Sequence, residues 1–147
     1  MKTMADNIMT SINAASSSSS STQSNNLTVM VVDDDNDILQ IMRKGLERAG
    51  HEVHAFSEPL LAIQHIQNGG CEKCSLLISD IRMPKMNGFQ LARRIKELRP
   101  DMKIIMMTAF EVNMNEVKIM YPSLQIDKII RKPIKISSLV TMVSIIH

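Results

Sequence analysis

Charged and hydroxyl side chains follow several apolar runs of this sequence, at the positions where buried strands would end. Asp33 and Asp34 follow one run, and Asp80 follows another. Thr108 and Lys132 follow two later runs. Ligands of open parallel sheets bind beyond the carboxyl ends of the strands, near the point where the strand order reverses. The sequence therefore predicts one polar site that is assembled from four separate segments.

The residue types at this site indicate phosphoryl chemistry with a metal ion. Three carboxylates close together cannot all stay ionised without compensation. Mg²⁺ would provide it, because this ion prefers a few carboxylates together with water and phosphate oxygens. An aspartate that faces Mg²⁺ and the ammonium group of Lys132 can act as a nucleophile and form an acyl phosphate. Thr108 could then donate a hydrogen bond to a phosphate oxygen.

The apolar runs that would position these residues alternate with amphipathic segments. The expected strands are residues 27–32, 51–56, 76–80, 103–108 and 125–131. The first expected helix begins at the capping residues 35–37 and stops at Gly50, and the others are about 59–67, 89–98, 114–121 and 138–146. Five strands that alternate with five helices predict a parallel sheet with helices on both faces.

The N-terminal segment differs from the rest of the chain. Residues 1–26 include an unbroken serine run at 16–21 and are predicted to form a disordered Ser-rich tail, which leaves residues 27–147 as the folded domain. The segment lacks the apolar stretch of a signal peptide, and no apolar run approaches the roughly 20 residues that a spanning helix needs. We therefore expect a cytoplasmic protein with no membrane association.

Composition argues against a nucleic-acid partner. The net charge is only +2, and no run of Lys and Arg is long enough to form a basic arm. Aromatic residues make up 3% of the chain and Trp is absent, so no surface for base stacking is evident.

Cys71 and Cys74 form a single C-x-x-C pair. A zinc site normally needs two more ligands, and the chain has no second cysteine pair. His51 and His65 could supply them, but a lone pair is more typical of a surface loop with two thiols. We therefore expect the pair to have no part in signalling.

The polar residues, taken in order, resemble the motifs of the receiver domain of response regulators in two-component signalling. That family has an acidic pair after the first strand and a phosphoacceptor Asp after the third, with Pro four and Gly eight positions later. A hydroxyl residue with a small neighbour follows the fourth strand, and a Lys-Pro pair follows the fifth. The matching residues are Asp33-Asp34, Asp80 with Pro84 and Gly88, Thr108-Ala109, and Lys132-Pro133. The resemblance spans about residues 27–147 and implies an α/β, flavodoxin-like, doubly wound sheet of five parallel strands in the order 2-1-3-4-5 with five helices, as in stand-alone chemotaxis regulators.

The resemblance assigns the acceptor and the metal ligands. It implies that Asp80 accepts the phosphoryl group and that Asp34 binds Mg²⁺ directly. Asp33 would contribute mainly through water, and the backbone carbonyl of Arg82 would be a further ligand. Mg²⁺ is thus the expected cofactor.

Other positions are assigned in the same way. Lys132 would pair with the phosphoryl group, Thr108 would respond to its presence, and Pro133 would follow a cis peptide bond. Relatives usually carry Tyr or Phe three residues before this Lys, as a rotamer switch coupled to the Thr. This chain has Ile129 there, so we expect the signal to leave the site through Thr108 and the loop that follows it.

The resemblance also implies partners. A sensor histidine kinase or a histidine phosphotransfer protein would phosphorylate Asp80. The chain ends at His147, soon after the fifth expected helix, which leaves no room for a DNA-binding output domain. We expect a stand-alone signalling switch that acts on an unknown downstream protein. It would not be an enzyme in the usual sense, although it could catalyse its own phosphorylation from small donors and its own dephosphorylation.

Two other functions fit part of the pattern. A phosphohydrolase of the haloacid dehalogenase type places its nucleophile in an Asp-x-Asp motif after the first strand, and residues 33–35 satisfy that motif. This interpretation leaves Asp80 unexplained. A pseudo-receiver would bind partners without being phosphorylated, but the complete acidic set together with Lys132 argues against it.

Overall fold

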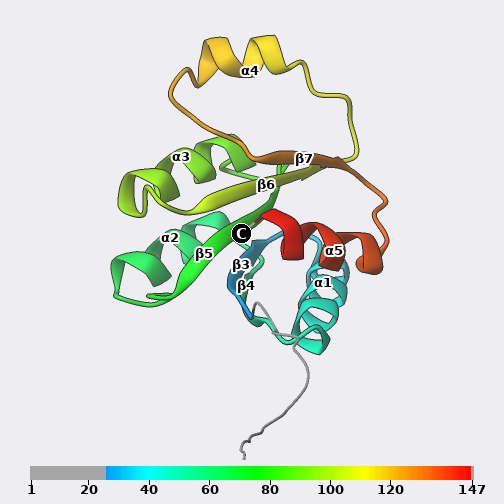
Figure 1. Cartoon of the computed structure of the whole chain (residues 1–147). Coiled ribbons are helices and arrows are strands. Elements are labelled where there is room, and N and C mark those ends of the chain that lie inside the picture. Colours follow the sequence, from blue (N-terminus) through cyan, green and yellow to red (C-terminus); the bar gives the residue numbers. More distant parts are fainter. Residues whose placement is uncertain (1–25, 147) are drawn as a thin grey trace, which may run out of the picture.

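Five strands and five helices alternate along residues 26–146, the part of the chain that the computed structural model describes (Figure 1). The strands are β3 (Thr28–Val32), β4 (Glu52–Phe56), β5 (Cys74–Asp80), β6 (Lys103–Thr108) and β7 (Lys128–Arg131). The helices are α1 (Asn36–Arg48), α2 (Pro59–Gln67), α3 (Gly88–Leu98), α4 (Met114–Met120) and α5 (Ile136–Ile146). None of these helices is long and apolar enough to span a membrane. The expected tail, residues 1–26, lies outside the described residues except for its last residue.

Every expected element is present, but some bounds differ from the sequence-based prediction. β5 begins earlier than expected, at Cys74, and α5 begins earlier, at Ile136. β7 begins at Lys128 and not at residue 125. Asp127 explains this late start, because its N–H donates to the Ile104 carbonyl at 2.9 Å and its Oδ2 accepts from the Ile104 N–H at 2.7 Å. A side chain therefore takes the place of one backbone acceptor at this end of the strand.

The strands form one sheet in the order β4-β3-β5-β6-β7, and all four neighbouring pairs are parallel. In chain order this is 2-1-3-4-5, which confirms the predicted flavodoxin-like topology. The direction of winding reverses between β3 and β5, so the carboxyl ends of these two strands flank the switch point where ligands of such sheets bind.

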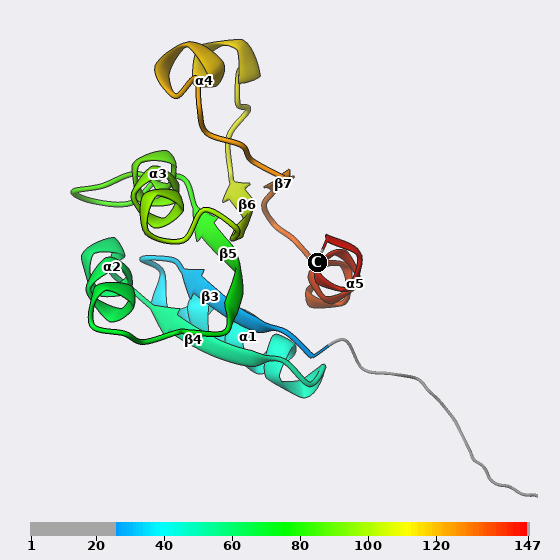
Figure 2. The same cartoon turned by 60° about the vertical axis from the view of Figure 1, so that its left-hand side comes forward.

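Helices cover both faces of the sheet (Figure 2). Alternate residues of each strand point to opposite faces, so Val29 and Val31 pack in the cluster with α1 and α5. Met30 and Val32 pack in the other cluster, with α2, α3 and α4. Both faces are therefore buried, and polar groups of the central strands have access to solvent mainly at the strand ends.

Candidate functional site

The side chains that were predicted to form a site meet at the carboxyl edge of the sheet. Asp33 follows β3, Asp80 and Thr108 are the last residues of β5 and β6, and Lys132 follows β7. Asp33, Asp80 and Thr108 are buried, whereas Asp34 is exposed. The site is thus closed on the side of the sheet and open on the side of Asp34.

Lys132 connects two of the carboxylates. Its Nζ lies 3.0 Å from Asp33 Oδ2 and 3.4 Å from Asp80 Oδ1. The Lys132 side chain is 17% exposed, and that of Asp33 is fully buried. A backbone hydrogen bond also joins the ends of β6 and β7, because the Lys132 N–H donates to the Thr108 carbonyl at 2.7 Å. The peptide bond between Lys132 and Pro133 is cis, as the resemblance implied.

The acidic residues of the site form a cluster whose chemistry suits a hard divalent cation. Asp33, Asp34 and Asp80 each offer a carboxylate oxygen, and these atoms lie within 4.8 Å of one another. One ammonium group, that of Lys132, cannot neutralise three carboxylates. Mg²⁺ prefers oxygen ligands and keeps several of its waters when bound. A carboxylate cluster that is open on one side leaves room for those waters. The residues present therefore fit Mg²⁺.

Burial and charge oppose each other at Asp80. Burial raises the pKa of the Asp80 carboxyl above its usual value, the neighbouring Asp33 raises it further, and Lys132 lowers it without cancelling the rise. At Lys132, burial lowers the pKa, but the hydrogen bond and charge of Asp33, with those of Asp80, outweigh burial and raise it. Lys132 is therefore a firmly held cation, and the ionised form of Asp80 is not fully compensated by the protein alone.

Asp35 has a different role from the two acids before it. Its Oδ1 accepts from the N–H groups of Asp37 and Ile38, at 3.0 and 3.3 Å, and so caps the N-terminus of α1. The Asp35 N–H donates to Asp33 Oδ1 at 2.9 Å. The hydrolase alternative required residues 33 and 35 to act together on a substrate. Asp35 is instead engaged by the helix, which removes the main support for that alternative.

Gly88 lets the loop after β5 pack closely against the acceptor. A Cβ atom at Gly88 would overlap the backbone carbonyl oxygen of Asp80 and approach Ile81 Cα to 3.0 Å. The Gly88 N–H donates to the Ile81 carbonyl at 2.8 Å. The next helix starts at this point with a capping box, in which Asn87 Oδ1 accepts from the Gln90 N–H and Gln90 Oε1 accepts from the Asn87 N–H, both at 2.9 Å. These contacts fix the backbone that carries the Asp80 side chain.

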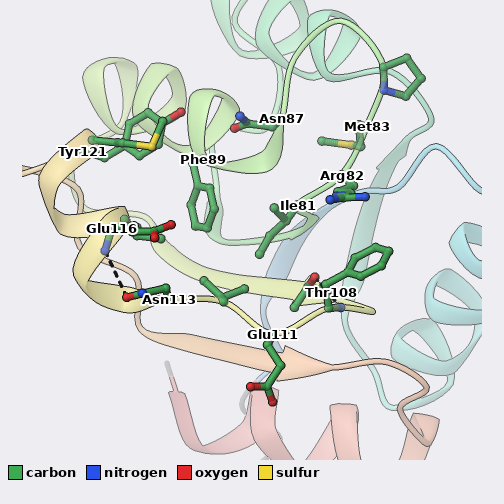
Figure 3. A pocket seen from close by; sticks show the side chains of 15 residues that line it. Ile81, Arg82, Met83, Asn87, Phe89, Thr108, Glu111, Asn113, Glu116 and Tyr121 are labelled. Carbon is green, nitrogen blue, oxygen red and sulfur yellow. Dashed lines mark hydrogen bonds between the residues drawn. The ribbon is translucent and has the colours of Figure 1, made fainter.

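A hollow of about 640 Å³ opens beside Thr108, between the β5–α3 loop and α4 (Figure 3). Thr108 and Tyr121 lie toward opposite ends of it, with Phe89 between them. The chain contains only four aromatic residues of the Phe, Tyr and Trp types, and three of them, Phe89, Phe110 and Tyr121, line this hollow. The hollow therefore has an apolar wall next to a residue of the site.

Thr108 is linked to the loop that follows it. The Phe110 N–H donates to Thr108 Oγ1 at 3.0 Å. The Phe110 side chain is half exposed, and its ring lies 4.2 Å from Arg82 Cζ in a cation–π contact. The sequence motifs assigned only the backbone carbonyl of Arg82 to the site and did not predict this side-chain contact. Its only sequence signal was an aromatic residue two positions after the Thr.

Ile129 takes the place in β7 where relatives carry an aromatic residue. It pairs with Met106 in the sheet register and packs, partly buried, against the cluster on the α2, α3 and α4 face. The structure therefore places an aliphatic, packed side chain at this position.

The expectation that the cysteine pair forms a surface loop with two thiols is wrong in two respects. Cys71 and Cys74 are 6% and 1% exposed, so they lie in the core and not in a surface loop. They are also joined in a disulfide. His51, which was considered as a companion ligand, accepts a hydrogen bond from the Leu27 N–H with its Nδ1. The histidine that lies beside the cysteines is His54, which the sequence reasoning missed.

Comparison with known proteins decides the family. The family model described as the response regulator receiver domain matches residues 29–144. The chain belongs to this family. It is the receiver domain of a response regulator, a signalling protein of two-component systems, as its motifs predicted.

Individual relatives agree with this assignment. The response regulator receiver protein CpdR of Brucella abortus is 43% identical over 75 residues, which are 51% of this chain and 60% of that protein. The transcriptional regulator NtrC of Azospirillum brasilense is 35% identical over 81 residues, which are 55% of this chain and 16% of that protein. The chain thus spans less than two thirds of the length of either relative. The crystal structure of a CheY-like receiver domain protein from Methanospirillum hungatei is 30% identical, with a TM-score of 0.70 over 82% of this chain and 92% of that chain.

Proposed function

We propose that this receiver domain is a phosphorylation switch whose acceptor is Asp80. The observation that carries the proposal is the position of Lys132 Nζ, 3.0 Å from Asp33 and 3.4 Å from Asp80 at the carboxyl edge of the sheet. An anionic phosphoryl donor would otherwise meet three carboxylates. A fixed ammonium group beside the acceptor stabilises the negative oxygens of the transferring group, and it does so without reorganisation during the reaction.

In the proposed reaction, a carboxylate oxygen of Asp80 attacks the phosphorus atom of a phosphohistidine on the donor protein. A phosphorus–oxygen bond forms, the phosphorus–nitrogen bond breaks, and the leaving imidazole nitrogen takes up a proton. The product is an acyl phosphate on Asp80. With acetyl phosphate as donor, acetate leaves instead. In this sense the domain would catalyse its own phosphorylation without being an enzyme that turns over a substrate.

We propose that Asp33, Asp34, Asp80 and the backbone carbonyl of Arg82 hold Mg²⁺. When bound, Mg²⁺ neutralises charge on the phosphoryl oxygens. We propose that Thr108 donates a hydrogen bond to the phosphoryl group. Its oxygen already accepts from the Phe110 N–H, so its hydroxyl proton is available for a phosphoryl oxygen.

The proposed donors are a sensor histidine kinase or a histidine phosphotransfer protein, and the proposed output is contact with a downstream protein. The net charge of +2 supports a protein partner over nucleic acid, because affinity for nucleic acid depends on neutralising several phosphates. We therefore propose that this domain signals through protein contacts and does not itself bind nucleic acid.

Intact mass measurement after incubation with acetyl phosphate and Mg²⁺ tests the acceptor. We expect one phosphoryl adduct that hydroxylamine removes, as it removes acyl phosphates. The Asp80→Asn variant should gain none. Asp101→Asn is the matched control, because Asp101 is exposed and lies outside the site, and it should be labelled like the unchanged protein. Equal labelling of the Asp80→Asn variant would refute the assignment.

A further inference from the structure

A second group of metal-ligating side chains lies on the sheet face that α2 covers. His54 is in the middle of β4, Cys71 is in the connection from α2 to β5, and Cys74 is the first residue of β5. One ligand atom of each of these three residues lies within 4.8 Å of the other two. His65, in the last turn of α2, brings its Nε2 to 3.0 Å from His54 Nδ1. Cys74 and Asp80 are opposite ends of β5, about 20 Å apart along the strand, so the cysteines of this group are far from the acidic site.

We propose that His54, His65, Cys71 and Cys74 form a binding site for a transition-metal ion of the zinc type, separate from the acidic site. Two thiolates and two imidazoles are a common tetrahedral ligand set for zinc, whereas Mg²⁺ prefers oxygen ligands. With zinc–nitrogen bonds of about 2.0–2.1 Å, two imidazole nitrogens in a tetrahedral site stand roughly 3.3 Å apart. The 3.0 Å between the two histidine nitrogens is close to that spacing.

Glu52 fixes the orientation of the His54 ring. Its Oε2 lies 2.9 Å from His54 Nε2, so the Nε2–H donates to the carboxylate and Nδ1 keeps its lone pair. That lone pair is directed to His65 Nε2. Without metal, the His65 Nε2–H donates to His54 Nδ1. When a metal ion binds, His65 would give up this proton to solvent and take one up at Nδ1, so that both facing nitrogens offer a lone pair. A carboxylate behind a metal-binding imidazole is a recurrent feature of zinc sites.

Arg99 fixes the backbone of the two cysteines, and Gly70 leaves room for the His65 ring. The Arg99 guanidinium donates to the backbone carbonyls of Cys71 and Cys74, at 2.8 Å each. A Cβ atom at Gly70 would overlap the His65 ring, so a glycine just before the first cysteine allows the imidazole to lie against the loop.

The backbone of the loop is constrained as well. Cys71 has a φ of 59°, a left-handed conformation that residues other than glycine rarely adopt. The Cys74 N–H donates to the Cys71 carbonyl at 3.0 Å, which closes a tight turn between the two cysteines. Such conformations persist only where the surrounding structure enforces them, and they cluster at functional sites.

The disulfide and the metal are alternative states of the proposed site, because both need the same two sulfur atoms. A dithiol reductant converts the disulfide into two thiols by transfer of two electrons and two protons, and itself becomes a disulfide. The metal ion then displaces the two thiol protons and binds the thiolates. The reduced protein should therefore bind the metal, and the oxidised protein should not.

Co²⁺ is a suitable probe, because thiolate ligands give it a charge-transfer absorption band that oxygen ligands at the acidic site do not give. The full-length protein is reduced, kept without air, and titrated with Co²⁺ in excess Mg²⁺, which occupies the acidic site. We expect one Co²⁺ per chain with the thiolate band, and Zn²⁺ should displace it. Protein that was oxidised beforehand should show no band.

Variants identify the ligands. His54→Gln and His65→Gln should each weaken binding by more than the 10–100-fold that loss of an outer-shell partner costs, and Glu52→Gln should weaken it by about that factor. His51→Asn is the matched control. His51 Nδ1 accepts from the Leu27 N–H, and the Asn amide oxygen can replace this acceptor, so cobalt binding should not change.

Absence of the thiolate band in the reduced protein would overturn the proposal. Unchanged affinity in both His54→Gln and His65→Gln would also overturn it, because the cysteines would then bind metal without the imidazoles. Thermal unfolding of each variant checks that it is folded. The two histidine variants keep both cysteines, so they decide the question even if the cysteines cannot be replaced without unfolding the domain.

Discussion

The ammonium group of Lys132 lies 3.4 Å from Asp80 Oδ1, yet the pKa of Asp80 is raised. Burial is the largest cause, and the charge of Asp33 adds to it. The lysine is shared, since its Nζ is closer to Asp33, at 3.0 Å. The protein thus leaves the acceptor carboxylate short of compensating positive charge, and a metal ion at the acidic cluster would supply it.

The first prediction follows from this imbalance. Because the folded-state pKa of Asp80 is raised, the folded protein holds this proton more tightly than the unfolded chain does. The contribution of Asp80 to the free energy of unfolding therefore falls as the pH rises from the unfolded pKa through the raised one, and it stays low at neutral pH. In metal-free buffer at pH 7, Asp80→Asn should unfold at a higher temperature than the unchanged protein. A gain of about 1 kcal/mol would correspond to roughly 2–8 °C for domains of this size range.

Two comparisons test the cause of that effect. The difference in unfolding temperature should shrink at low pH, where Asp80 is protonated in both states. Mg²⁺ should stabilise the unchanged protein more than Asp80→Asn, because ligand binding to the folded state adds to stability. An Asp80→Asn variant that is less stable than the unchanged protein at pH 7 would contradict the prediction.

The second prediction concerns the metal. EDTA should suppress labelling by acetyl phosphate, because the carboxylate cluster then repels the anionic donor. Asp34→Asn should suppress it as well. Asp35→Asn is a matched control that also removes one negative charge, but Asn can keep the cap on α1 through its amide oxygen. Labelling should therefore survive in Asp35→Asn. Intact mass over a time course gives both rates, and full labelling in EDTA would rule out a metal requirement.

The third prediction concerns the loop behind the acceptor. Gly88→Ala would place a Cβ against the Asp80 carbonyl, so backbone must move. We expect a loss of roughly 1–3 kcal/mol of stability, as for other overpacked positions, and slower labelling of Asp80. Gly69→Asn is the control, because nothing lies within 4 Å of a Cβ there and Asn tolerates the left-handed φ of 85°. Urea unfolding and labelling rates measure both effects. Unchanged values for Gly88→Ala would show that the loop has room to adjust.

The fold and the acidic edge could be predicted because their signals are local. Each residue of the site stands directly at a strand end, and the strands themselves are short apolar runs with clear breaks. Parallel order and the switch point then bring Asp33, Asp80 and Lys132 together from distant parts of the sequence. The number of residues between any two of them in the sequence does not by itself indicate that they meet.

The second cluster could not be predicted in this way. Its four side chains come from two strands, a helix end and a loop, so their meeting depends on how α2 packs on β4. His51 and His54 look equally suitable in the sequence. Which of the two can join the cluster depends on the pleat of the strand. His54 is in β4 and points toward α2, whereas His51 precedes β4 and accepts from the Leu27 N–H. The cysteine loop is also joined to the end of α3 by Arg99, whose guanidinium donates to the Cys71 and Cys74 carbonyls, and this contact has no signal in the sequence.

The last prediction concerns the output of the switch. In relatives with an aromatic residue before the Lys, the Thr and the ring move together. Ile129 has no ring, is stiff at its first side-chain torsion and is packed against the core. The Thr108 oxygen instead accepts from the Phe110 N–H, and the Phe110 ring contacts Arg82 on the loop after the acceptor. We therefore expect phosphorylation to pull on Thr108 and to displace Phe110 from Arg82, beside the hollow that Phe110 lines with Phe89 and Tyr121.

Amide NMR with and without beryllofluoride, which stands in for the phosphoryl group, measures this change. A charge-assisted hydrogen bond from Thr108 can supply about 1.5–3 kcal/mol, which is enough to shift a population between two states. We expect large shifts at residues 108–111 and smaller ones around Ile129. Thr108→Val should abolish the large shifts. Thr141→Val is the matched control, since the Thr141 hydroxyl is exposed and donates to the Ser137 carbonyl on α5. A dominant change at Ile129, with residues 108–111 unmoved, would show that the signal takes another path.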